Sequence, residues 1–142
     1  MLVDRIATVR PVLDEEADER TLAIFADIKA TKKIDFVPNF WRVLATNPDL
    51  LASVWTTLKR TMHPESLGQT SRLDPRTREI IALAVSATNN CDYCINSHTA
   101  ALMKLGVDSE TLGEMMAIVG LFNMTNSLAN GYRVRPDVVP KQ

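Results

Sequence analysis

Apolar side chains recur every three or four residues along most of the chain, a spacing that is typical of helices. In the stretch 18–31 the recurring residues are Leu22, Phe25 and Ile28. Pro48 follows Asn47 and suits the first position of another helix, which is expected to run to about Met62. No segment alternates between apolar and polar residues for more than a few positions. The pattern therefore predicts an all-α fold, a compact helical domain of about six helices.

A particularly well-marked helix is predicted to begin after Asp74. This aspartate is a good N-cap, Pro75 suits the first helical position, and no breaker occurs before Thr88. Most of the surface of this helix is apolar. A helix that is hydrophobic nearly all round is usually enclosed by others, so this one is expected to be the buried central helix.

Two further helices are predicted after the break at residues 89–90. One runs over about 91–105 and ends at Gly106, and the other starts at 108–109 and ends at Gly131. A set of apolar residues gives this last helix an uncharged face: Met115, Met116, Ile118, Val119, Leu121, Phe122 and Met124. Such a face is too apolar for the surface of a small monomer, so it predicts part of the core together with a subunit interface.

The composition narrows the class of protein further. A chain of 142 residues fits one domain, 1–142, and its 46% apolar and 23% charged residues are typical of soluble globular proteins. The net charge of -1 argues against a nucleic-acid partner and against attraction to an anionic membrane. The longest uncharged stretch, 115–132, holds five polar residues and is a poor bilayer span. With no secretory signal at its start, the protein is expected to be cytoplasmic.

Both cysteines and one of the two histidines fall within eight residues, which makes this segment the candidate functional site. On a helix, Cys91, Cys94 and His98 share one face, because they are spaced at i, i+3 and i+7. The first helical turn favours thiolates, and an imidazole can take a proton from a thiol. Glu79 could orient that imidazole if the two helices pack antiparallel. The segment thus combines a nucleophile, a base and an orienting acid.

This cluster has three possible interpretations. The residues could be together by chance, since free cysteine is often buried and inert. They could instead form a metal site, in which Glu79, Cys91, Cys94 and His98 supply four ligands. Structural zinc sites usually draw a second pair of thiolates or imidazoles from farther along the chain, and no such pair is present. A redox-active dithiol is therefore favoured, and neither a metal nor a bound cofactor is expected.

The pattern Glu-x11-Cys-x2-Cys-x3-His, with Gly106 closing the helix, resembles the alkylhydroperoxidase D and carboxymuconolactone decarboxylase superfamily. The resemblance includes the segment VPNFWRVLATNPDLL and covers roughly residues 35–130. Members without the cysteines are decarboxylases, so this chain resembles the peroxidase branch. The resemblance implies an all-helical, antioxidant oxidoreductase with peroxiredoxin activity that assembles as a homotrimer or homohexamer.

The resemblance also implies how the site residues act. Cys94 attacks the hydroperoxide and becomes a sulfenic acid, and Cys91 supplies a proton and then condenses with it to a redox-active disulfide. Glu79 and His98 form the proton relay. An external dithiol, such as a lipoyl protein or a thioredoxin-like partner, reduces the disulfide. Thioredoxin-like logic would instead make Cys91 the nucleophile, but the i+4 placement of His98 beside Cys94 favours the family's assignment.

One position departs from the family pattern. The best-studied branch carries a relay histidine next to the second cysteine, where this chain has Tyr93. A phenol is a poor base near neutral pH, so peroxidase activity could be weaker or the substrate could differ. Two alternative functions stay open: an acid–base enzyme like the carboxymuconolactone decarboxylases, and a metal-binding structural module. His63 is predicted to be a surface residue, and Asn123 either borders a pocket or satisfies buried backbone groups.

Overall fold

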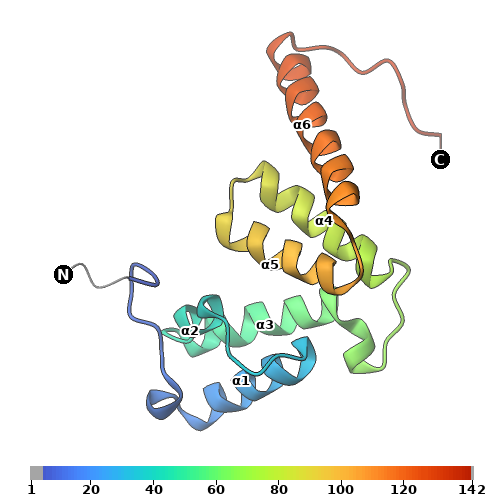
Figure 1. The fold of residues 1–142 in the computed structure, drawn as a ribbon. Coiled ribbons are helices and arrows are strands. Elements are labelled where there is room, and N and C mark those ends of the chain that lie inside the picture. Colours follow the sequence, from blue (N-terminus) through green and yellow to red (C-terminus); the bar gives the residue numbers. More distant parts are fainter. Residues whose placement is uncertain (1–4, 142) are drawn as a thin grey trace. The chain divides into compact units, whose positions relative to one another are not determined.

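A computed structural model describes residues 5–141, and its described part contains six α-helices and no strand (Figure 1). The helices are α1 Glu19–Lys32, α2 Asn39–Leu44, α3 Pro48–Met62, α4 Pro75–Thr88, α5 Asp92–Lys104 and α6 Ser109–Gly131. Two short 3₁₀ helices accompany them, η1 Asp14–Glu16 and η2 Pro64–Leu67. The predicted all-α fold is therefore confirmed. None of the helices within 5–141 is both long and apolar enough to span a bilayer.

The helices begin where the sequence places their caps. Four side chains accept a hydrogen bond from the backbone N–H group three residues later: Asp18, Asn47, Asp74 and Asp108. Each bond satisfies one of the N–H groups that the first turn of a helix leaves without an intrahelical partner. In all three aspartate caps, hydrogen bonds from the hydroxyl and the backbone N–H of a threonine hold the pKa of the carboxyl group below the ordinary value of 3.8.

The chain forms two compact units, Met1–Arg72 and Leu73–Gln142. The core of the first unit comes from α1, α2, α3 and the segment before α2, and its buried residues are Phe25, Ile28, Val37, Trp41, Ala45, Leu51 and Trp55. The rings of Trp41 and Trp55 meet edge to face, with their centroids 5.2 Å apart. Trp55 donates its indole N–H to Asp27, which also binds Lys59 at 2.8 Å. The two tryptophans are thus core residues.

In the second unit, α4 and α5 pack side by side, and α6 also contacts α4 (Figure 1). Its fully enclosed core is small and consists of Leu83, Leu102 and Val107. Gly106 has a φ of 80°, a left-handed conformation that glycine adopts without strain, and it turns the chain so that Val107 packs beside Leu102. This C-cap therefore closes the hydrophobic core beneath the α4–α5 pair.

The prediction that 75–88 forms the buried central helix is wrong for the isolated chain. Ile81 and Val85 of α4 are 48% and 54% exposed, because only one side of the helix packs on its neighbours. The helix α6 likewise contains no buried residue, and Phe122 is 55% exposed. Burial depends on which elements cover a helix, and the apolar pattern alone does not carry that information.

Candidate functional site

The chemistry-bearing residues all lie on the α4–α5 pair of the second unit. Glu79 is in the first half of α4, and Cys94 and His98 are in the first two turns of α5. Cys91 precedes α5 as its N-cap, one position outside the helix that was predicted to contain it. Its Sγ accepts a hydrogen bond from the backbone N–H of Cys94 at 3.3 Å. A sulfur at this place receives the N–H group that the first turn leaves without an intrahelical partner.

The two cysteines are joined as a disulfide, and their Cα atoms are 5.2 Å apart. A reversible dithiol needs two thiols that can meet without moving the backbone, and the CxxC spacing across the helix start provides this. Zinc binds thiolates, not disulfide sulfurs. Across residues 5–141, no group of three or more His, Cys, Asp or Glu side chains is arranged to hold a metal ion.

Glu79 and His98 form a close pair across the two helices. The Oε2 atom of Glu79 lies 2.7 Å from Nδ1 of His98, and the two side chains are only 13% and 26% exposed. The contact that the proposed relay requires is therefore present. A carboxylate on Nδ1 fixes the orientation of the ring and leaves Nε2 as the nitrogen for proton exchange. His98 follows Cys94 by one helical turn, on the same face of α5.

A family model relates the sequence of this chain to known proteins. The model of the carboxymuconolactone decarboxylase family matches residues 48–134, more than half of the chain. The chain belongs to the carboxymuconolactone decarboxylase family. This family member is also similar to a solved structure, the alkylhydroperoxidase AhpD core from Rhodospirillum rubrum. The TM-score is 0.85 and the identity 41%, over 94% of this chain and 96% of that chain.

Curated relatives of this carboxymuconolactone decarboxylase family member have names that refer to alkyl hydroperoxide reduction. The alkyl hydroperoxide reductase AhpD of Streptomyces griseus is 44% identical over 43 residues, 30% of this chain and 24% of that protein. An alkyl hydroperoxide reductase of Mycobacterium tuberculosis is 27% identical over 109 residues, 77% of this chain and 29% of that protein. The chain thus spans about a quarter of the length of the curated relatives that it matches.

Three other residues that were considered from the sequence take no part in the Glu79–His98 contact or in the disulfide of this family member. Tyr93 lies on α5 between the cysteines and is 44% exposed. His63 belongs to the first unit, where it caps the end of α3. Asn123 of α6 donates its side-chain amide to the hydroxyl of Thr88 at 3.1 Å and so ties α6 to the last turn of α4. It lies on an exposed surface and does not satisfy buried backbone groups.

Sequence reasoning treated residues 89–90 only as a helix break, although the structure gives Asn90 a specific task. Asn90 has a φ of 56°, in the left-handed region. The next residue, Cys91, donates its backbone N–H to the carbonyl of Ser86 at 3.0 Å. Asparagine is the residue other than glycine that most readily adopts this conformation, so the Asn-Asn pair is the signal that could have located the turn.

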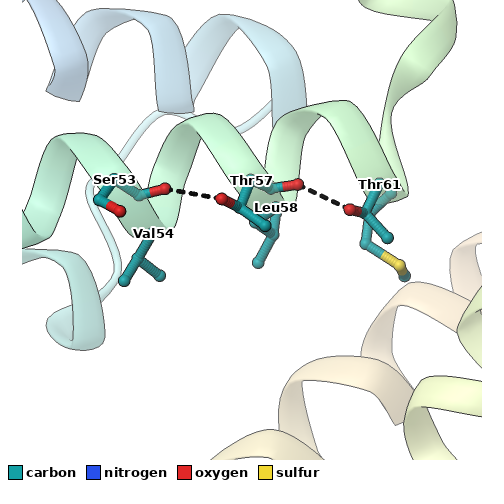
Figure 2. Close-up of a pocket in the computed structure, with 6 residues that line it drawn as sticks. Ser53, Val54, Thr57, Leu58 and Thr61 are labelled. Carbon is teal, nitrogen blue, oxygen red and sulfur yellow. Dashed lines mark hydrogen bonds between the residues drawn. The ribbon is translucent and has the colours of Figure 1, made fainter.

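A shallow pocket of the first unit contains none of this chemistry. It lies along one face of α3, and six residues line it: Ser53, Val54, Thr57, Leu58, Thr61 and Met62. Figure 2 shows the hydroxyl of Thr57 directed at the carbonyl of Ser53 and that of Thr61 directed at the carbonyl of Thr57. Because the helix itself satisfies these hydroxyls, the pocket presents mainly methyl groups and aliphatic side chains. No titratable side chain lines it, so we place the candidate site on α4 and α5.

Proposed function

We propose that this protein is a thiol-dependent peroxidase that reduces hydroperoxides through Cys91 and Cys94, in antioxidant defence. The observation that carries the proposal is the Cys91–Cys94 disulfide at the start of α5. The second turn of this helix holds His98, which is paired with Glu79 of α4. The names of the curated relatives and of the similar AhpD core support it. A dithiol, a histidine and a carboxylate within one helix pair suit a nucleophile with its own proton relay.

In the oxidative half of the cycle, the Cys94 thiolate attacks the terminal oxygen of the hydroperoxide. The O–O bond breaks, the alkoxide leaves and takes up a proton, and Cys94 becomes a sulfenic acid. Cys91 then attacks the Cys94 sulfur, which releases water and forms the disulfide. His98, held by Glu79, accepts the Cys94 thiol proton at the start. Cys91 supplies the proton that the alkoxide takes up, and His98 returns its own proton to the hydroxide that Cys94 releases, so that water leaves.

In the reductive half, an external dithiol attacks the disulfide and passes through a mixed disulfide, until both cysteines are thiols again. A lipoyl protein or a thioredoxin-like protein has the required chemistry, and the protein itself needs no bound cofactor. Such reductants work in a reducing compartment, and this supports a cytoplasmic location. The exposed apolar face of α6 fits assembly into a homotrimer or homohexamer.

The test is to replace each cysteine and to measure hydroperoxide consumption with a dithiol reductant. Cys94→Ser should abolish turnover, whereas Cys91→Ser, measured without the reductant, should consume about one equivalent of hydroperoxide and stop at the Cys94 sulfenic acid, because the protein then has no second thiol to condense with it. Ser97→Ala, at an exposed position of α5, is the control and should turn over normally. Normal turnover by Cys94→Ser would overturn the proposal.

A second candidate follows from the name of the matching family. The Glu79–His98 pair could serve acid–base chemistry without any change in the redox state of the cysteines. Such an enzyme would turn over a carbon acid in excess reductant and without peroxide. A substrate screen under these conditions distinguishes the two, since a thiol peroxidase should then show no turnover.

A further inference from the structure

In the connection between α4 and α5, local hydrogen bonds fix the position of Cys91. The helix α4 ends in a pair of hydrogen bonds, from the N–H of Cys91 to the carbonyl of Ser86 at 3.0 Å and from the N–H of Asn90 to the carbonyl of Ala87 at 3.4 Å. This is the Schellman motif, which requires a left-handed residue just after the helix. Asn90, with its φ of 56°, is that residue.

The same cysteine also starts the next helix. The carbonyl of Cys91 accepts the N–H of Ile95 at 2.8 Å, and its Sγ accepts the N–H of Cys94 at 3.3 Å. The backbone N–H, the backbone carbonyl and the sulfur of Cys91 are therefore all fixed by local bonds. The left-handed turn at Asn90 makes this arrangement compatible with a helix on each side.

We propose that Asn90 is a positioning residue for the redox pair, and that its left-handed backbone holds the sulfur of Cys91 where it can bond to Cys94. The inference rests on the thiol–disulfide chemistry of the proposed function. In the disulfide form, the S–S bond ties Cys91 to α5, so the turn must keep its conformation. In the dithiol form, only hydrogen bonds hold Cys91, and a residue that disfavours the left-handed region can relax.

A side chain that resists a positive φ should therefore destabilise the disulfide more than the dithiol. Valine is such a residue, because its branched Cβ makes the left-handed conformation a true outlier, whereas glycine adopts it freely. Asn90 is exposed, so these substitutions change the backbone preference and disturb little packing. The expected consequence is a redox pair that is easier to reduce in Asn90→Val and unchanged in Asn90→Gly.

The chain offers a matched control in its first unit. Lys33 is also exposed, has a φ of 54°, and occupies the same place in a Schellman motif at the end of α1. Its N–H bonds to the carbonyl of Ala30 at 3.4 Å, and the N–H of Ile34 bonds to the carbonyl of Lys29 at 3.1 Å. Lys33→Val imposes the same backbone strain with no cysteine beside it.

The experiment equilibrates the purified protein with mixtures of oxidised and reduced dithiothreitol and measures the fraction of disulfide. In this exchange the two protein thiols give two electrons and two protons to the dithiothreitol disulfide, so no peroxide is involved. Asn90→Val should lower the equilibrium constant for disulfide formation about tenfold. A tenfold change corresponds to a rise of about 30 mV in the reduction potential. Asn90→Gly and Lys33→Val should stay within about twofold of the unmodified protein.

An unchanged equilibrium constant in Asn90→Val would overturn the inference, as would an equal shift in Asn90→Gly or in Lys33→Val. If Asn90→Val does not fold, Asn90→Ala takes its place, with a smaller shift in the same direction expected. Because the measurement needs only thiol–disulfide exchange, it can succeed even if hydroperoxide is not the substrate. Failure here therefore differs from failure of the Cys94→Ser test.

Discussion

Replacing Glu79 with glutamine tests whether the Glu79–His98 pair serves catalysis or only structure. The amide of glutamine has nearly the same shape as the carboxylate and can still bond to the ring, so the contact survives while the charge is lost. The bond is short, at 2.7 Å, and the two side chains are 13% and 26% exposed, so little water competes for it. Hydrogen bonds with a charged partner contribute about 1.5–3 kcal/mol and neutral ones about 0.5–1.5 kcal/mol, so the free energy of unfolding should fall by about 1 kcal/mol.

The effect on turnover should be much larger than the effect on stability. General acid–base catalysis contributes about 10²–10⁴-fold, and a neutral partner no longer supports a positive charge on His98. We therefore expect Glu79→Gln to lower the rate of hydroperoxide-driven disulfide formation about 100-fold or more in a single-turnover measurement. Urea unfolding gives the stability of the same sample, and Glu114→Gln, an exposed carboxylate of α6, is the control. A normal rate in Glu79→Gln would refute the relay.

Two further predictions concern assembly and acid stability. Leu121→Glu puts a charge on the exposed apolar face of α6. Light scattering should therefore show that the homotrimer or homohexamer dissociates, while circular dichroism shows an unchanged helix content. A monomeric unmodified protein would refute the prediction that this face is a subunit interface. In the first unit, burial raises the pKa of Asp27, but hydrogen bonds from Lys59 and Trp55 outweigh it and hold the pKa below 3.8. The Asp27 carboxylate therefore stabilises the fold above its unfolded-state pKa of about 3.9, and this contribution is lost as the pH falls through its lower folded-state pKa. The midpoint of urea unfolding should drop less between pH 6 and pH 3 in Asp27→Asn than in the control Asp35→Asn, whose substitution is at an exposed position.

The helix boundaries could be predicted because their signals are local. The caps at Asp74 and Asp108 and the glycine at Gly106 act on their own backbone neighbours, so reading the sequence locates them within about two residues. The site residues could be grouped for the same reason, since Cys91 and His98 belong to one short segment.

What escaped prediction depends on contacts between elements or on backbone dihedral angles. The exposure of Val85 could not be foreseen, because an apolar side chain in the sequence does not reveal which helix will cover it. The bonds of Asp27 to Trp55 and Lys59 join α1 to α3, and no sequence spacing indicates them. The role of Asn90 in the turn between α4 and α5 could be recognised only from its positive φ, which the sequence does not give.

The short distance along the chain between the site residues has a consequence for the order of folding. Glu79 and His98 are separated by 19 residues, and the cysteines lie between them. Contacts between residues that are near in sequence cost little loop-closure entropy and form early. The contacts within the helical hairpin α4–α5 can therefore form early, and Leu112 and Met115 of α6 then pack against its core. Local folding alone thus brings together the cysteine pair and the Glu79–His98 contact, with no contact between distant parts of the chain required.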